Sequence, residues 1–266
     1  MEIKLVALDL DDTLLDTGLK ISAECIAVIK EARRQGTMIT LSTGRMYQSA
    51  LPYARQLEID VPLVTYQGAW VKNTLTGEEL YYKPVPGDLA RQVMTYFRRL
   101  GVHYHSYYND ELCMETMSEE GLYYSRLAGV KTHLVADLIA ELENNDAMKI
   151  MAITDNEKVL LEMEEELKSC LGRELHITRS KPYFLEVMSR EANKARALQV
   201  VADHYGINRK EVMAVGDSYN DIEMIEWAGL GVAMANALGP VKDAADFVTS
   251  SNEEEGVAEA IRRFVL

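Results

Sequence analysis

The segment Asp9-Leu10-Asp11-Asp12-Thr13 places three carboxylates at the end of a short apolar run. That run, residues 3–10, is continuously apolar apart from Lys4 and Asp9. A run of this kind is typical of a parallel strand that is buried on both faces. Ligands of open α/β sheets bind beyond the carboxyl ends of the strands. Carboxylates crowded at such a point either share protons or hold a cation.

A second pair of carboxylates follows a later apolar run. Asp217 and Asp221 lie in Gly216-Asp217-Ser218-Tyr219-Asn220-Asp221, directly after an expected strand at 211–215. One aspartate after a strand is usually explained as a helix cap or a turn residue. Two such clusters in one chain favour a shared site, and their oxygen ligands suit Mg²⁺ better than zinc if the two strands are neighbours.

The sequence around these clusters alternates between strand and helix patterns. Ser22 precedes a helix that ends at Gly36, and a helix is expected at 193–205 before Gly206. This order predicts an α/β fold with a doubly wound, parallel-sheet, Rossmann-like core. The other elements expected in this part are strands at 38–41, 63–66, 211–215, 230–234 and 247–249, and a helix at 221–227.

The middle of the chain has a different pattern. An amphipathic helix at 88–100 precedes two strand-like runs, 103–108 and 112–116, which Asn109-Asp110 joins as a plausible tight turn. Hairpins mixed with helices predict an α+β module. We therefore expect residues 1–83 and 191–266 to form the catalytic core, and 84–190 to form an inserted cap domain. The module's other expected elements are helices at 120–128, 136–144 and 157–171, and strands at 148–154, 175–179 and 183–188.

The composition of the 266-residue chain is that of a globular protein: 48% of residues are hydrophobic and 26% are charged. This excludes a disordered chain, a collagen and a coiled coil. A net charge of −14 argues against nucleic-acid and anionic-membrane partners. We expect a cytoplasmic protein with reduced thiols. The three cysteines form no CxxC pair, and the start of the sequence shows no basic segment followed by an apolar one.

Two further features are candidates for binding an anion. Ser42-Thr43-Gly44-Arg45 follows the second expected strand, and its hydroxyls and N–H groups can form a phosphate seat. Lys194 opens the helix after the insertion, where a cation is slightly disfavoured by the helix dipole. A buried anion close to Lys194 would explain its place.

Taken together, these motifs resemble the haloacid-dehalogenase superfamily of aspartate-nucleophile phosphotransferases over the whole chain. DLDDTLL (9–15) resembles its first motif, Thr43 the second, Lys194 the third and GDSYND (216–221) the fourth. The long insertion between the second and third motifs resembles a C2-type cap. The run 229–237 resembles the Cof-type sugar-phosphate phosphatases of that superfamily.

The resemblance implies a Mg²⁺-dependent phosphatase that hydrolyses small phosphate monoesters, such as sugar phosphates, through an aspartyl-phosphate. Asp9 would be the nucleophile and Asp11 the general acid and base, which argues against dehalogenation because a halide needs no acid to leave. Asp9, Asp217 and the backbone carbonyl of Asp11 would bind the metal. The phosphate contacts would be Thr43, Gly44, Lys194 and Asn220, and the supporting residues would be Asp221, Thr13 and Arg45.

The chain departs from the superfamily at two places. Gln67 stands before Gly68 where relatives usually carry Asn, and 191–195 replace the usual Gly-Val-Ser-Lys-Gly. A specific substrate therefore does not transfer. A phosphotransferase or phosphomutase of the same superfamily and a non-catalytic sugar-phosphate-binding regulator remain open. A receiver domain is excluded because it would be about half this length and would carry its acceptor after the third strand. A dinucleotide-binding Rossmann domain is excluded because Met234 breaks the glycine pattern.

The expected cap offers candidate contacts to the rest of the substrate. Strand alternation places His103, His105 and Tyr107 on one face, and Tyr104 and Tyr108 on the other. We expect the partner to be a small phosphorylated metabolite and the protein to be a monomer or a weak homo-oligomer. Two weaker candidates are Arg179 and Tyr183.

Overall fold

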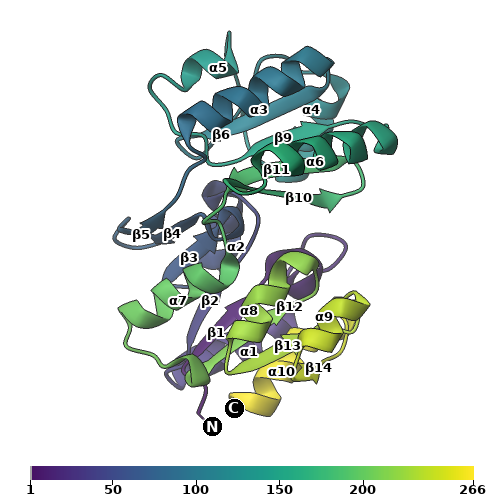
Figure 1. Ribbon diagram of the computed structural model, residues 1–266. Helices are drawn as coiled ribbons and strands as arrows, with labels where there is room; N and C mark the ends of the chain where they lie inside the picture. Colours follow the sequence, from purple (N-terminus) through teal and green to yellow (C-terminus); the bar gives the residue numbers. More distant parts are fainter. Residues whose placement is uncertain (1) are drawn as a thin grey trace. The chain divides into compact units, whose positions relative to one another are not determined.

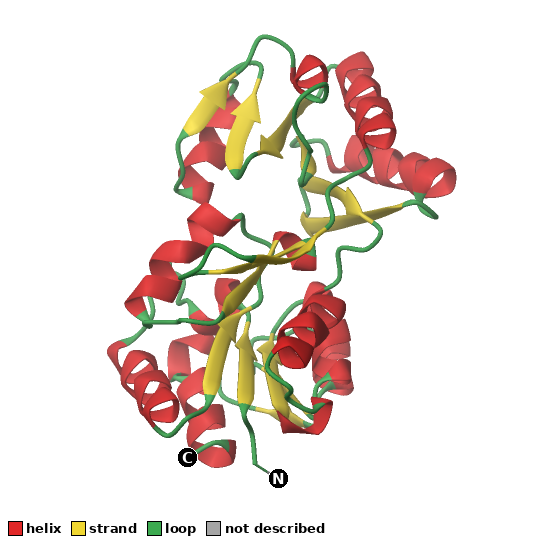
Figure 2. Cartoon of the chain, turned by 90° about the vertical axis from the view of Figure 1, so that its left-hand side faces the viewer, coloured by secondary structure: helices red, strands yellow, loops and turns green. Residues whose placement is uncertain are grey.

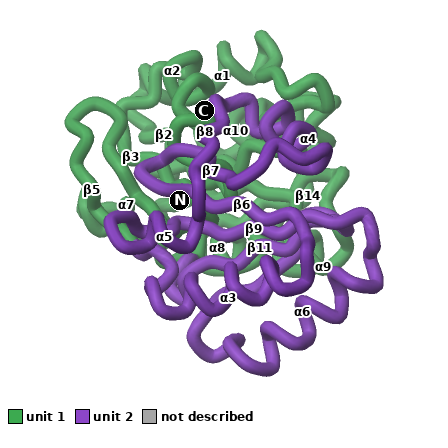
Figure 3. The backbone as a smooth tube through the Cα atoms, turned by 90° about the horizontal axis from the view of Figure 1, so that it is seen from above, with its two compact units in different colours: residues 1–82, 193–266 green, residues 83–192 purple. Residues whose placement is uncertain are grey.

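The computed structural model describes residues 2–266 and divides into two compact units (Figure 3). The first unit, here called the core unit, runs up to Tyr82 and resumes at Asn193–Leu266. The second, the inserted unit, is Lys83–Ala192. The sequence places the junctions after residues 83 and 190, within two residues of these bounds.

The core unit is built on a parallel sheet of five strands in the order β14-β13-β12-β1-β2 (Figure 1). In the register, Leu8 lies beside Val215 on one side and Leu41 on the other. The carboxyl ends of the neighbouring strands β12, β1 and β2 therefore meet at one edge of the sheet. The strands are β1 (Leu5–Leu8), β2 (Met38–Leu41), β12 (Val212–Gly216), β13 (Leu230–Ala233) and β14 (Phe247–Val248).

Helices cover both faces of this sheet, as a doubly wound fold requires (Figure 2). Leu5 and Ala7 of β1 pack in one apolar cluster with Leu198 of α7 and Met224 of α8. The alternate residues of β1 point to the other face, where α1 packs against α10. The helices are α1 (Ala23–Arg34), α2 (Tyr47–Gln56), α7 (Lys194–His204), α8 (Ile222–Trp227), α9 (Gly239–Ala244) and α10 (Gly256–Phe264).

The third expected strand differs from the prediction in its main pairing, which is antiparallel. β3 (Pro62–Thr65) pairs antiparallel with β4 (Trp70–Asn73), which pairs with β5 (Glu79–Tyr82). It meets the parallel sheet through the isolated bridge between Ser42 and Val64. The reason is the turn at 66–68, where all three residues have positive φ and the chain reverses onto β3. On its other side the Val64 carbonyl accepts from the Thr43 N–H at 2.9 Å, so β3 also stays beside the end of β2.

The inserted unit is an α+β module, as its mixed pattern indicates. Its sheet has the order β10-β11-β9-β6-β7-β8 and is antiparallel except for the pairing of β7 with β8. Asn109 and Asp110, with φ of 52° and 61°, form the predicted tight turn between β6 and β7. The strands are β6 (His103–Tyr108), β7 (Glu111–Met114), β8 (Thr132–Leu134), β9 (Ile150–Ile153), β10 (Leu175–Lys181) and β11 (Phe184–Ser189); the helices are α3 (Gly87–Leu100), α4 (Glu119–Ala128), α5 (Leu138–Glu141) and α6 (Glu157–Leu171).

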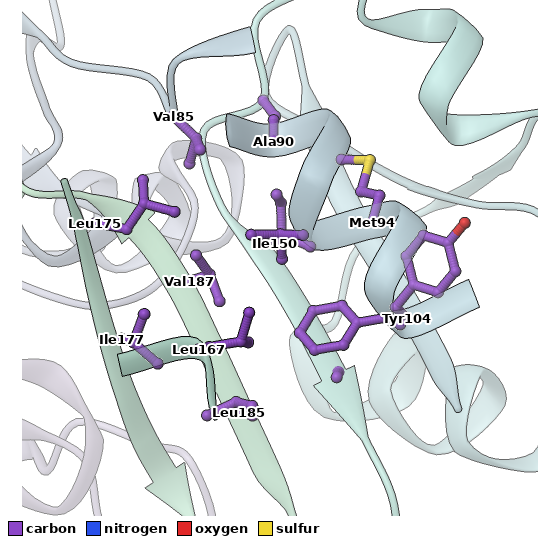
Figure 4. Packing of buried hydrophobic residues seen from close by; sticks show 14 of the residues in the cluster. Val85, Ala90, Met94, Tyr104, Ile150, Leu167, Leu175, Ile177, Leu185 and Val187 are labelled. Carbon is purple, nitrogen blue, oxygen red and sulfur yellow. The ribbon is translucent and has the colours of Figure 1, made fainter. Parts of the chain in front are cut away.

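One face of the inserted sheet forms the apolar core of this unit (Figure 4). Ile150 of β9 and Val187 of β11 pack there with Met94 of α3 and Leu167 of α6. Tyr104 belongs to the same cluster, as alternation along β6 predicts. The opposite face carries the polar residues described below. Among residues 2–266, no helix has the length and apolar character needed to cross a bilayer.

Candidate active site

The parallel register brings the two carboxylate clusters together. The backbone N–H of Asp9 donates to the carbonyl of Val215 at 3.0 Å, so the end of β1 lies beside the start of the 217–221 loop. Asp9, Asp217 and Asp221 are all buried, and one carboxylate oxygen from each lies within 4.8 Å of the others. The two strands are thus neighbours, which was the condition set by the sequence for a shared site.

The chain after β1 takes an irregular turn that positions Thr13. Asp11 is extended and Asp12 has φ of 59° within the 10–14 segment. The Thr13 hydroxyl donates to Oδ1 of Asp217 at 2.8 Å, and the Ser218 hydroxyl donates to Oδ2 of the same carboxylate at 3.0 Å. Both oxygens of Asp217 are therefore oriented by hydroxyl donors.

Asp221 closes the 217–221 loop on itself. Its Oδ2 accepts the backbone N–H groups of Asp217 and Ser218, each at 3.0 Å. A Cβ on Gly216 would lie 2.5 Å from the Asp221 side chain, so this approach requires glycine. With one oxygen committed to the loop, Asp221 turns its Oδ1 toward Lys194.

Lys194 is the buried cation between the clusters. It is the first residue of α7, its side chain is 1% exposed, and its Nζ donates to Oδ1 of Asp9 at 2.7 Å and to Oδ1 of Asp221 at 2.6 Å. The Asn193 side chain caps the helix by accepting from the Arg196 N–H. The position of Lys194 is thus explained by buried anions, as expected.

Electrostatics in this cluster are dominated by burial. Burial, with Asp221 and Asp217 close by, raises the pKa of Asp9 well above its usual range even though Lys194 opposes the shift. Burial and Asp221 raise the pKa of Asp217 to about 6. Burial alone would lower the pKa of Lys194, but Asp221 and Asp9 outweigh it and raise that pKa.

Three buried carboxylates therefore face one lysine. This excess of negative charge and the all-oxygen donor set fit a hard divalent cation such as Mg²⁺.

A second group of loops meets beside this cluster. Thr43 is 1% exposed, and its hydroxyl accepts the Arg45 N–H at 3.2 Å. A Cβ on Gly44 would lie 2.4 Å from Nε2 of Gln67, whose Oε1 accepts from Nδ2 of Asn220 at 2.8 Å. Gln67, noted above as a departure from the superfamily pattern, thus links the 42–45 loop to the 217–221 loop.

Gly68 holds this turn against the start of α7. Its φ is 91°, and a Cβ there would lie 2.3 Å from the carbonyl oxygen of Asn193. Both the backbone conformation and the space exclude a side chain. The hairpin of β3 thereby fixes the place where Lys194 enters the site.

Asp11 is oriented separately from the buried carboxylates. Its side chain is 48% exposed, and its two oxygens accept from Nε and Nη2 of Arg45 at 2.8 and 2.6 Å. A bidentate arginine pair fixes the plane of a carboxylate as well as its position. Arg45 is therefore a direct clamp on Asp11.

The cap candidates lie within the inserted unit. His103 contacts the Ser118 hydroxyl through Nδ1 at 2.9 Å, His105 is fully buried, and the Tyr107 hydroxyl bonds that of Tyr124. The two weaker candidates have other partners: Arg179 pairs with Glu164, and Tyr183 contacts Tyr123.

The sequence reasoning missed one buried ion pair in this unit, Lys149 with Glu186. The available signal was a charged residue inside, or directly beside, an apolar strand pattern.

Comparisons with known proteins identify the family of this chain. The family model of haloacid dehalogenase-like hydrolases matches residues 6–261. A 5-amino-6-(5-phospho-D-ribitylamino)uracil phosphatase of Bacillus subtilis, YcsE, is 34% identical over 272 residues, covering 100% of this chain and 97% of its own. An HMP-PP phosphatase of Serratia proteamaculans is 30% identical over 246 residues, covering 90% and 86%.

The solved structures show the same fold. A crystal structure of a haloacid dehalogenase-like hydrolase from Bacteroides thetaiotaomicron superposes with a TM-score of 0.92 at 32% identity, covering 98% of this chain and 99% of its own. The parallel core, the strand-end carboxylates and these matches over nearly the whole length lead to one conclusion. The chain belongs to the haloacid dehalogenase-like hydrolase family and is a phosphatase of that family.

Proposed function

We propose that this phosphatase hydrolyses small phosphate monoesters, such as those of sugars and related metabolites, with Mg²⁺ and through an aspartyl-phosphate on Asp9. The observation that carries the proposal is the buried Asp9 at the end of β1, with Lys194 on one oxygen and Asp217 close by. The ribityl phosphate in the name of one relative supports sugar-like phosphate monoesters as the substrate class. The different substrate named for the other relative keeps the proposal at the level of a class.

Mg²⁺ bound by Asp9, Asp217 and the backbone carbonyl of Asp11 would reduce the repulsion between a carboxylate and a phosphate. The chain's own residues then carry out two steps. An oxygen of Asp9 attacks phosphorus, and the bond from phosphorus to the ester oxygen breaks as protonated Asp11 gives that oxygen its proton. The alcohol leaves, and Asp9 carries the phosphoryl group.

In the second step Asp11, now a carboxylate, takes a proton from a water molecule. The water oxygen attacks phosphorus, the bond to Asp9 breaks, and inorganic phosphate leaves. The Arg45 clamp supports this step because it holds Asp11 as an oriented carboxylate.

Four groups are proposed to hold the phosphoryl oxygens during both steps. The Nζ of Lys194 supplies positive charge, while the Thr43 hydroxyl, the Gly44 N–H and the Asn220 amide supply donors. Thr13 and Asp221 would support them indirectly, since each orients another group of the site. Gln67 is added to this supporting set because it bonds Asn220 and contacts Gly44.

We further propose a division of labour between the two units. Every residue assigned to the chemistry above belongs to the core unit, and none to Lys83–Ala192. The core unit would therefore be the catalytic core, and the inserted unit a cap domain that selects the ester.

The test uses p-nitrophenyl phosphate hydrolysis with matched variants. Activity should vanish in EDTA and return with Mg²⁺, and Asp9→Asn should abolish it because an amide does not attack phosphorus. Acid-quenched wild-type protein should carry phosphate that Asp9→Asn lacks. Asp203→Asn, at the far end of α7, is the control and should keep full activity. Undiminished hydrolysis in EDTA, or by Asp9→Asn, would overturn the proposal.

A further inference from the structure

The segment that carries Asp11 is held by two asparagines from the C-terminal part of the core unit. Nδ2 of Asn236 donates to the carbonyl of Asp12 at 2.7 Å, and Nδ2 of Asn252 donates to the carbonyl of Leu15 at 2.9 Å. The partners are 224 and 237 residues apart in the sequence, so only the fold brings them together. Neither asparagine belongs to the site described above.

Asn236 lies on a loop that is itself fixed to the core sheet. The loop links β13 to α9 (Figure 1). The N–H of Met234 donates to the carbonyl of Gly216 at 3.0 Å, so the loop begins beside the end of β12. The N–H of Asn252 donates to Oδ1 of Asn236 at 3.1 Å, so both ends of the Asn236 amide are bonded. Asn236 therefore connects the end of β12 to the 10–14 segment.

The bond from Asn236 fixes one particular peptide group. The carbonyl of Asp12 and the N–H of Thr13 belong to the same rigid plane, so the orientation of this plane sets the direction of the chain on both sides. Asp11, the proposed acid, comes directly before Asp12. Thr13 comes directly after it, and its hydroxyl donates to Asp217 at 2.8 Å. A rotation of this peptide would displace both Asp11 and Thr13.

The turn does not favour this arrangement by itself. Asp12 has φ of 59°, a left-handed conformation that is uncommon for residues other than glycine. Strained backbone of this kind persists where the surrounding structure holds it in place. The N–H of Leu15 donates to the carbonyl of Leu10 at 2.9 Å, which joins the ends of the segment. The bond from Asn236 holds the peptide between these ends.

The exposure of Asn236 argues against a main role in the stability of the fold. The residue is exposed to solvent, so water can replace its bond to the Asp12 carbonyl and the net contribution to folding is small. Such a bond can still select one of two backbone conformations that are close in energy. Geometry matters more than stability here, because a misplacement of about 1 Å can slow an enzymatic reaction about 10²-fold.

We propose that Asn236 is a positioning residue for phosphoryl transfer. Its amide holds the peptide between Asp12 and Thr13 so that Asp11 can deliver its proton to the ester oxygen as that oxygen leaves phosphorus. The inference rests on the proposed function, because it takes Asp11 as the acid. Asn236 acts through the backbone of Asp12 and is not itself a catalytic residue.

The experiment compares two esters of nearly the same shape. The quantity measured is kcat/KM for phenyl phosphate divided by kcat/KM for p-nitrophenyl phosphate. Phenolate needs protonation to leave more than p-nitrophenolate does, so this ratio reports how well Asp11 delivers its proton. Asn236→Asp is nearly isosteric and keeps an oxygen for the Asn252 N–H, but it loses the donor. Asn236→Asp and Asn236→Ala should each lower the ratio by about two- to tenfold, the range of a single hydrogen bond.

Thr74→Val is the matched control. The Thr74 hydroxyl donates to the carbonyl of Ile59 at 3.1 Å, and Ile59 lies before the start of β3, at the opposite end of that strand from the 66–68 turn. The control thus removes a bond from a side chain to a backbone carbonyl within the same unit. It should leave the ratio at the wild-type value.

A double variant separates positioning from a general loss of structure. Adding Asn236→Ala to Asp11→Asn should leave the ratio where Asp11→Asn alone puts it, because the effect of Asn236 passes through Asp11. A further fall in the double variant would overturn the inference. A wild-type ratio in folded Asn236→Ala and Asn236→Asp proteins would overturn it as well.

Hydrogen exchange tests the contact without turnover. Amide exchange in residues 10–15, followed by mass spectrometry in EDTA, should become faster in Asn236→Ala and stay unchanged in Thr74→Val. Unchanged exchange in Asn236→Ala would overturn the positioning role. Undiminished hydrolysis by Asp9→Asn would instead overturn the proposed function, and the exchange comparison would still decide whether Asn236 holds this segment.

Discussion

Lys194→Met is the substitution that tests the electrostatics of the core site most directly. The methionine side chain is close to lysine in length but carries no charge. It would leave Asp9 and Asp221 buried without their cation, which now lies 2.7 and 2.6 Å from their oxygens. We expect the metal-free protein to become less stable and to lose phosphatase activity.

The size of the stability loss follows from the burial of all three partners. Removing one member of a buried pair costs about 3–5 kcal/mol, because it leaves an uncompensated buried charge. For 266 residues unfolding together, an unfolding entropy of about 2.1 cal/mol/K per residue converts this to a fall of about 5–9 °C in melting temperature. The pair of exposed Lys168 with half-buried Glu164 supplies the control. Arg179 would still compensate Glu164, so Lys168→Met should change stability by at most about 1 kcal/mol.

The loss of stability in Lys194→Met should depend on pH, and the direction follows from the pKa shifts. Burial raises the pKa of Asp9 and of Asp217 in the folded protein, so the folded state holds protons that the unfolded state releases. Protonation at low pH therefore relieves the repulsion, and stability falls as pH rises through these raised values. The deficit of Lys194→Met should be largest at pH 8 and shrink toward pH 5.

The assay is urea unfolding in EDTA at both pH values, followed by circular dichroism. Adding Mg²⁺ at pH 8 should restore part of the lost stability, because the cation replaces some of the missing positive charge. A Lys194→Met protein as stable as wild type at pH 8, with no change in the difference at pH 5, would refute the reasoning that Lys194 compensates buried carboxylates.

Four other outcomes are expected. The affinity for Mg²⁺, titrated calorimetrically, should fall by at least about tenfold per pH unit below pH 6, because Asp217 protonates there and the pKa of Asp9 is raised as well; a pH-independent affinity would exclude Asp217 as a ligand. Asp11→Asn should slow the phosphoryl-transfer step of alkyl phosphates by about 10²–10⁴-fold but slow p-nitrophenyl phosphate less, since its leaving group needs little protonation; equal losses would argue against Asp11 as the acid. With 84–190 replaced by a Gly/Ser linker and folding confirmed by circular dichroism, the core should still cleave p-nitrophenyl phosphate while its preference among sugar phosphates collapses; a folded core that binds Mg²⁺ without cleaving it would place catalytic groups in the insertion. Gly68→Ala should lower the free energy of unfolding by about 1–3 kcal/mol or more, because it adds strain at positive φ and a clash with the Asn193 carbonyl. A denaturation midpoint equal to that of the wild type would contradict this.

Much of this protein's architecture was determined by local patterns in the sequence. The apolar run at 3–10 contains β1, and the expected helices at 88–100 and 157–171 match α3 and α6 closely. Such patterns report burial and backbone preference within a few residues, which is why they can be read without the fold. Motif spacing likewise identified the strand-end carboxylates, since a strand followed by Asp9 or Asp217 fixes where those side chains emerge.

Tertiary structure decided how these pieces meet. An anion near Lys194 could be expected from the sequence. Only the packing of α7 against β1 and β12 showed that the Lys194 ammonium lies between Asp9 and Asp221. Local pattern also gave no warning that β3 pairs mainly with its own antiparallel hairpin, because a strand has the same sequence pattern whichever neighbour it pairs with.

The same holds for the groups that only long-range contacts define. In the sequence Gln67 is only a departure from a motif. In the structure its amide lies between Gly44 and Asn220. Lys149 and Glu186 are ordinary charges in the sequence, and their pairing depends on the register of β9 with β11. Propensity acts along the chain, whereas hydrogen bonds and Coulomb energies depend on distances between residues far apart in sequence, and the packed fold alone sets those distances.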